Sequence, residues 1–174
     1  MSSSGGARGG TFLRFRTGTT GASARHVAYI TRERAVVDRE KAVFLFQLPD
    51  HVRAATGYDE LRQTLIGYAE TREEIEVAQH RSRGEPRTHY RVTASFERDV
   101  SNEKALAMAE EWLQREFPRA RGFAVVHRDT EQTHIHVWID ARQVDDRKVQ
   151  LSRHQHRRRG RQLMTNGMNG RRRR

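Results

Sequence analysis

The chain has 174 residues, enough for one ordinary domain with a hydrophobic core, and 35% of them are hydrophobic. It has no cysteine, which excludes disulfides, thiolate metal sites and a cysteine nucleophile. No apolar run approaches the roughly eighteen residues of a membrane span, and no charged-then-apolar leader opens the sequence. We therefore expect a soluble, cytoplasmic protein without membrane insertion.

The net charge of +11 is unevenly distributed along the chain. Nine of the 33 Lys and Arg residues lie in residues 151–174, which hold no acid, so residues 1–150 keep 24 basic against 22 acidic side chains, a balance of +2. Such a run is typical of a disordered basic arm that adds nonspecific affinity for nucleic acid. We expect a disordered Ser/Gly-rich segment at 1–10, one domain at 11–150 and a disordered basic tail at 151–174.

The first half of the domain begins with an alternating strand at 11–16, followed by a loop. Ser23 is positioned to cap a helix over residues 24–33, so Tyr29 would project from a rigid helix. The apolar run at 42–48 fits either a strand or an inserted loop packed on the core. Helical spacing and a dense Glu/Arg face then predict one long helix or two consecutive helices within 58–83.

The second half alternates strands with one helix. Residues 88–96 are rich in β-formers, 102–117 are amphipathic behind the N-cap candidate Ser101, and apolar runs follow at 121–127 and 134–140. The order strand, helix, strand, strand predicts an α+β fold, with helices packed on an antiparallel central sheet.

The last two predicted strands carry three histidines that can converge. His134 and His136 are two residues apart, so both rings leave the same face of a strand. The six polar residues after His127 can turn the chain back antiparallel, which returns His127 to the other two. We therefore expect the three rings to lie together on the open face of the sheet.

Three neutral imidazoles suit manganese, nickel, zinc or, less readily, magnesium, and they leave coordination positions open. An open position favours catalysis over a scaffolding role. Asp129 is well placed to accept a hydrogen bond from the distal N–H of a ligand ring, which would fix the orientation of that ring.

A cation held beside DNA acts as a Lewis acid on a scissile phosphate, and the attacking group is then either water or a tyrosine oxygen. Water would make a simple metal nuclease. A tyrosine would conserve the phosphodiester energy in a covalent intermediate. The chain offers Tyr29, Tyr58, Tyr68 and Tyr90, all upstream of the histidines.

His-x-Asp followed by His-x-His on the next strand resembles the metal motif of HUH endonucleases, specifically plasmid mobilisation relaxases. Thr17-Gly18, Ala22-Ser-Ala-Arg25 and the segment 28–33 resemble the MobA/MobL-type region that presents a nucleophilic tyrosine. Relaxases place this tyrosine before the histidine motif, whereas rolling-circle initiators place it after. The chain order thus favours a relaxase.

One departure from the family pattern is Asp140, where family members often carry Asn. Another is the passage beyond the histidine strand into an Arg-rich tail, where relaxase domains usually continue with further helix and sheet.

The resemblance implies an HUH/relaxase-like fold and site-specific nicking of one DNA strand at a plasmid transfer origin. Tyr29 would attack and become linked to the 5′-phosphate, while His127, His134 and His136 would hold Mg²⁺ or Mn²⁺, with Asp129 supporting them. The implied partners are single-stranded or supercoiled plasmid DNA and accessory mobilisation proteins, in a bacterial cytoplasm.

Other side chains are weaker candidates. Arg25 and Arg32 are candidate phosphate contacts and Trp138 a candidate for stacking on a DNA base, although ordinary solvation and core filling explain them equally well. We interpret four further histidines as surface or tail residues: His26, His89, His154 and His156. The alternative functions are a noncatalytic nucleic-acid-binding module, a rolling-circle replication initiator or a nuclease that uses water.

Overall fold

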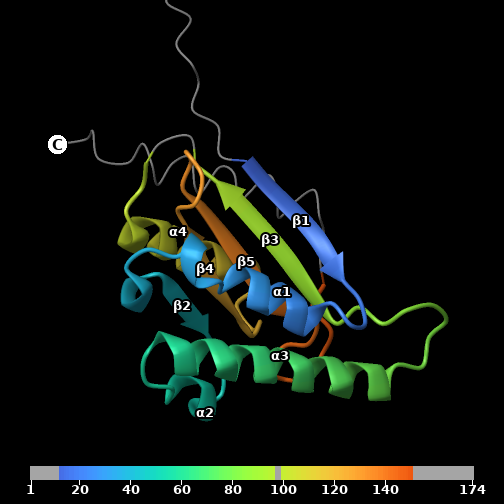
Figure 1. The fold of residues 1–174 in the computed structure, drawn as a ribbon. Helices are drawn as coiled ribbons and strands as arrows, with labels where there is room; N and C mark the ends of the chain where they lie inside the picture. The colour runs from blue at the N-terminus through green and yellow to red at the C-terminus, as the bar shows by residue number, and fades with distance from the viewer. Residues whose placement is uncertain (1–11, 97–98, 151–174) are drawn as a thin grey trace, which may run out of the picture.

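The computed structural model describes residues 12–96 and 99–150. Five strands form one sheet in the order β1-β3-β5-β4-β2, and every neighbouring pair is antiparallel. The strands are β1 (Phe12–Gly18), β2 (Val43–Phe46), β3 (His89–Ser95), β4 (Gly122–His127) and β5 (His134–Asp140). With helices packed on this antiparallel sheet, the α+β expectation is confirmed (Figure 1).

Within these ranges four α-helices accompany the sheet: α1 (Ser23–Ile30), the short α2 (Asp50–Arg53), α3 (Tyr58–Gln79) and α4 (Asn102–Glu116). Two 3₁₀ turns lie between α1 and β2, at Glu33–Ala35 and Arg39–Lys41. The predicted cap of α4 is confirmed, because the Ser101 side chain accepts a hydrogen bond from the Lys104 backbone N–H.

Each face of the sheet has its own hydrophobic core. On one face α4 packs Met108, Trp112 and Leu113 against Val126 and Ile135. On the other face α1 and α3 enclose a second core that the sheet supplies from β4 and β5; its buried members include Val27, Ile30, Leu65, Tyr68, Ala69, Phe123, Val125 and Trp138. Figure 1 shows α1 and α3 together on one side and α4 on the other. The histidine face is therefore the face that α1 and α3 partly cover.

The structure decides two alternatives that the sequence left open. Residues Val43–Phe46 form strand β2, which pairs with β4 at one edge of the sheet. Residues Tyr58–Gln79 form one continuous helix rather than two.

The expected start and end of α1 are wrong. Residue Ala22 occupies the N-cap position without a side-chain cap, while the Ser23 hydroxyl accepts a hydrogen bond from the indole of Trp138. The helix ends at Ile30 instead of Glu33. The Ser23 hydroxyl therefore bonds to a side chain of the sheet instead of capping the helix.

The segments 1–10 and 151–174, expected to be disordered, lie outside the described residues. Among the residues that the structure does describe, no helix is both long enough and apolar enough to cross a membrane.

A candidate metal centre beside an exposed tyrosine

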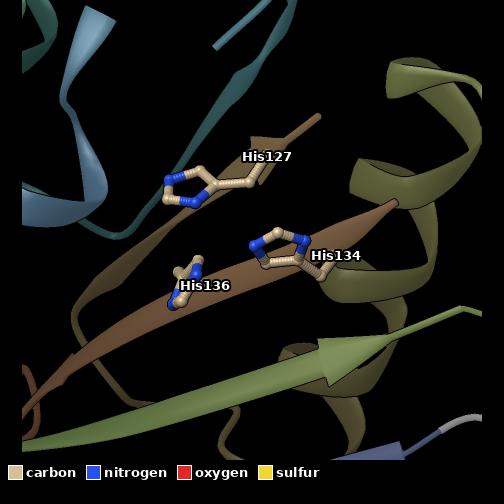
Figure 2. Close-up of side chains that lie close together, drawn as sticks. All are labelled: His127, His134 and His136. Carbon is tan, nitrogen blue, oxygen red and sulfur yellow. The ribbon is translucent and has the colours of Figure 1, made fainter. Parts of the chain in front are cut away.

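The hairpin of β4 and β5 brings the three histidines together. His127, the last residue of β4, pairs directly with His134, the first residue of β5, and His136 follows on the same face. Each ring offers one ligand nitrogen, and the three nitrogens lie within 4.8 Å of one another. Figure 2 shows the three rings gathered above the two strands. The convergence predicted from the sequence is thus present.

The histidine face is not open, contrary to our expectation, because the end of α1 lies over it. His127 is fully buried, while His134 and His136 are half-buried. The Nε2 atom of His127 lies 2.6 Å from the backbone carbonyl oxygen of Ile30, the last residue of α1. A carbonyl only accepts, so Nε2 carries the proton and Nδ1 keeps its lone pair. Within the described residues this buried Nδ1 has no hydrogen-bond partner.

The other two rings are oriented in a similar way. Nδ1 of His134 lies 3.2 Å from the carbonyl oxygen of Gln132, and Nδ1 of His136 lies 3.4 Å from the hydroxyl of Thr93. In metal sites the second nitrogen of a ligating histidine usually makes such a bond, which fixes the tautomer and the ring orientation. Each ring therefore has one nitrogen bonded to its surroundings and one left for a ligand.

Burial keeps two of these imidazoles in the neutral form that binds metal. Desolvation lowers the pKa of His127 to about 4. Desolvation, followed by repulsion from His127 and His134, lowers the pKa of His136 to about 3. Both rings are thus neutral at pH 7, and a cation placed among them meets lone pairs rather than positive charge.

These observations fit a metal ion. The orphaned, buried Nδ1 of His127 belongs to a group of three imidazoles, a donor set that suits borderline divalent ions. The group found among the described residues has three protein ligands and no carboxylate, so an ion held there would keep positions for outside oxygen atoms. The triad could therefore hold a metal ion.

Tyr29 lies against this triad from the last turn of α1. The centroid of its ring is 6.1 Å from that of His136 and 6.5 Å from that of His127, and both contacts are edge-to-face. The side chain is nevertheless 53% exposed. A phenol so placed is accessible to a large substrate while it remains next to the candidate metal ligands.

Asp129 does not make the predicted hydrogen bond to a histidine ring. Its Oδ1 is 3.8 Å from Nε2 of His134, beyond hydrogen-bonding distance, and its Oδ2 instead forms an ion pair of 2.5 Å with Arg32. Desolvation opposes ionisation of this carboxyl, but the hydrogen bond and charge of Arg32 outweigh it and lower the pKa of Asp129. The backbone carbonyls of Ile30 and Gln132 occupy the supporting role that we had expected for Asp129.

Arg32 joins this carboxylate to the tyrosine. Its guanidinium lies 4.0 Å from the centroid of the Tyr29 ring and donates to the Tyr29 backbone carbonyl at 2.8 Å. Arg25, one turn before Tyr29 on α1, is exposed and donates to the Gly21 carbonyl. Arg32 thus lies against the exposed tyrosine, whereas the Arg25 side chain is bonded near the start of α1.

Trp138 is fully buried, which removes it from the candidates for stacking on DNA. Its ring stacks on Phe123 and on His89, and its N–H donates to the Ser23 hydroxyl. The indole therefore belongs to the core beneath α1 and α3.

His89, interpreted from the sequence as a surface residue, is part of this core, and His26 is half-buried beside it. His89 is fully buried and stacks on His26 at 5.6 Å between centroids. A Cβ at residue 18 would come within 1.9 Å of the His89 ring, so only Gly18 leaves room for that ring. The glycine in the Thr17-Gly18 motif was the sequence signal for this close approach. His154 and His156 lie outside the described residues.

Comparison with known proteins gives one family. The sequence model of the family described as Relaxase: MobA/VirD2-like, nuclease domain, matches residues 53–166, which include all three histidines. No curated protein matches the chain.

Proposed function

The chain belongs to the MobA/VirD2-like relaxase nuclease family, and from that premise we propose that it nicks one DNA strand at a plasmid transfer origin through a covalent 5′-phosphotyrosine at Tyr29. This would be the first step of conjugative mobilisation. The observation that carries the proposal is the position of Tyr29, exposed to solvent and in ring contact with His127 and His136. Because α1 precedes residue 53, the choice of Tyr29 rests on this geometry and not on the family match.

The environments of the other three tyrosines favour Tyr29. The hydroxyl of Tyr58 donates to the Thr31 carbonyl at 2.6 Å, and burial raises the pKa of Tyr58 to about 12. Tyr68 and Tyr90 are buried in the two cores, and burial also raises the pKa of Tyr68. Access to a DNA phosphate requires an exposed hydroxyl, so these three side chains fit structural roles.

His127, His134 and His136 would hold Mg²⁺ or Mn²⁺. The bound ion would supply Lewis-acid neutralisation of the charge that builds on the phosphate during the transfer. The protein's own part is to keep the rings of His127 and His136 neutral through burial, and to orient all three rings through the Ile30, Gln132 and Thr93 contacts.

In the proposed step the phenolic oxygen of Tyr29 forms a bond to phosphorus, and the bond from phosphorus to the 3′ oxygen breaks. The proton that the phenol gives up balances the one gained by the leaving 3′-hydroxyl, and the energy of the phosphodiester is kept in the phosphotyrosine. The reverse attack of a 3′-hydroxyl rejoins the strand. A strand-transfer reaction needs this rejoining step. Hydrolysis would dissipate the energy of the phosphodiester and prevent it.

Arg32 and Arg25 would act on the phosphates around Tyr29. The Arg32 guanidinium already lies over the tyrosine ring, where its pairing with Asp129 holds it in position. Arginine is well suited to this contact, because its planar fork matches two phosphate oxygens. The partners of this site would be single-stranded or supercoiled plasmid DNA, with accessory mobilisation proteins, in the cytoplasm of a bacterium.

The direct test is covalent capture. The full chain is incubated with Mn²⁺ and a random-sequence pool of single-stranded oligonucleotides, adducts are separated on a denaturing gel, and the DNA-linked peptide is mapped by mass spectrometry. An adduct on Tyr29 that disappears with EDTA is the expected result. Cleavage without an adduct would replace the proposal with a nuclease that uses water. DNA binding that ignores EDTA and His136→Ala, with no cleavage, would indicate a noncatalytic module.

A further inference from the structure

The face that carries the histidines continues across β3 and β1, to the sheet edge opposite β2. Side chains that pair across antiparallel strands lie on the same face. Thr93 pairs with His136 on one side and with Arg14 on the other. Two residues along β3, Arg91 pairs with Trp138 and with Arg16. The histidine face therefore ends in an arginine-rich region on β1 and β3, the edge opposite β2.

Arg16 and Arg91 are cross-strand neighbours of like charge. In the described part of the chain, no hydrogen bond or ion pair joins either guanidinium to a carboxylate. The Nε atom of Arg91 is buried and also lacks a hydrogen-bond partner among the described residues. Partial burial, and then the charge of Arg16, lower the pKa of Arg91. Two adjacent like charges of this kind cost folding free energy, and a bound anion would offset that cost.

This arginine pair is close to the candidate metal centre. Two residues along a strand span about 6.6 Å, so Arg91 lies about that far along β3 from Thr93, which touches His136. A strand of DNA that reaches the triad can therefore reach Arg91 within a few nucleotides.

We propose that Arg16 and Arg91 form a binding site for a backbone phosphate of the single DNA strand that flanks the cleavage point. This inference rests on the proposed function, and it adds where the strand runs after it leaves the metal centre: over β3 and β1. The site reads phosphate and not base, because two guanidiniums on a sheet face offer charge and paired donors to any sequence. It would thus set the path of the strand and leave the choice of origin to other contacts.

The test measures binding without cleavage. The full chain carrying Tyr29→Phe is titrated with a fluorescent single-stranded oligonucleotide in EDTA, by anisotropy, over a series of salt concentrations. Arg16→Gln and Arg91→Gln are compared with Arg115→Gln, which removes the same charge from α4 on the opposite face. For each phosphate that a variant no longer neutralises, the slope of log affinity against log salt is expected to fall by about 0.7. Arg115→Gln is expected to leave the slope unchanged.

A thermal melt without DNA separates a binding role from a structural one. Because the pair is repulsive, Arg91→Gln should leave the melting temperature unchanged or raise it. A clear fall would assign Arg91 to the fold, and Arg16→Gln, at an exposed position on the edge strand, then decides the proposal by itself.

Equal slopes for all three variants, or no binding of single-stranded DNA by the parent chain, would overturn the phosphate site. The outcome is independent of the covalent step, because Tyr29→Phe and EDTA remove that step from the assay. Reduced slopes with no adduct in the capture experiment would keep the phosphate site and reject the proposed nicking activity.

Discussion

The ring of Tyr29 meets the ring of His136 edge to face, at 89° and 6.1 Å between centroids, although the two residues are separated by more than a hundred positions in the sequence. The contact is possible because the last residue of α1, Ile30, is held by its carbonyl against His127. One hydrogen bond thus connects the helix that carries the tyrosine to the strand that carries a candidate metal ligand. The site is assembled by this docking of α1 onto β4.

Replacing Tyr29 by Phe should abolish covalent attachment of DNA while metal and DNA binding remain, because only the hydroxyl is removed. Tyr58→Phe is the matched control. It loses the hydrogen bond to Thr31, worth about 1 kcal/mol of stability, but should still form the adduct. Denaturing gels of both variants give the comparison, and an unchanged adduct yield for Tyr29→Phe would reject this tyrosine as the nucleophile.

Removing one triad member should weaken metal binding. At 100 times its dissociation constant, a metal that binds only the folded state stabilises the protein by about 2.7 kcal/mol. Melts with and without Mn²⁺ should show a shift for the parent chain that largely disappears in His136→Ala. The exposed His51, outside the triad, provides the control His51→Ala. If both variants kept the full shift, the ion would have to bind elsewhere.

The protein should lose stability as the pH falls from 6.5 towards 4. Burial lowers the pKa of His89 to about 4, whereas an unfolded histidine titrates near 6.5. The unfolded state therefore binds more protons in this window, and acidification favours it by up to about 1.4 kcal/mol per pH unit for each such histidine. Urea unfolding at several pH values measures the slope. His89→Phe keeps a stacking ring and should reduce the slope by the share of one histidine, while His127 and His136 keep contributing. An unaltered slope would show that His89 does not contribute.

Glu73 of α3 should matter for the placement of α1. Its carboxylate accepts hydrogen bonds from the backbone N–H groups of Gly21 at 2.5 Å and Ser23 at 3.0 Å, where α1 begins. Glu73→Ala should cost about 1–2 kcal/mol of stability and slow adduct formation at Tyr29, because α1 is released from α3. Glu74→Ala, at the exposed neighbouring position, should do neither. Equal behaviour of the two variants would contradict this anchoring role.

The Arg72–Asp140 pair should be a strong structural contact. Asp140 is 1% exposed, and its carboxylate lies 2.5 Å from the Nε atom of Arg72 on α3. Arg72→Met leaves a buried carboxylate without its partner and should cost about 3–5 kcal/mol. Adding Asp140→Asn removes the unpaired charge and should recover much of the loss. Arg115→Met breaks an exposed pair and should cost less than about 1 kcal/mol. Denaturant melts of the four proteins test this order.

The sequence by itself determined the features that depend on local periodicity. Alternation along a strand places His134 and His136 on one face, and the polar turn returns His127 to them, so the triad could be predicted without coordinates. The α+β class and the cap at Ser101 followed from the same short-range rules.

Only the tertiary structure decided how distant segments meet. Local patterns do not reveal that α1 lies on the histidine face, which buries His127 and Trp138 and gives the role expected of Asp129 to the Ile30 carbonyl. They also do not reveal that Arg16 is the cross-strand neighbour of Arg91. Burial and register depend on packing between residues far apart in the chain, and that packing is a property of the whole fold.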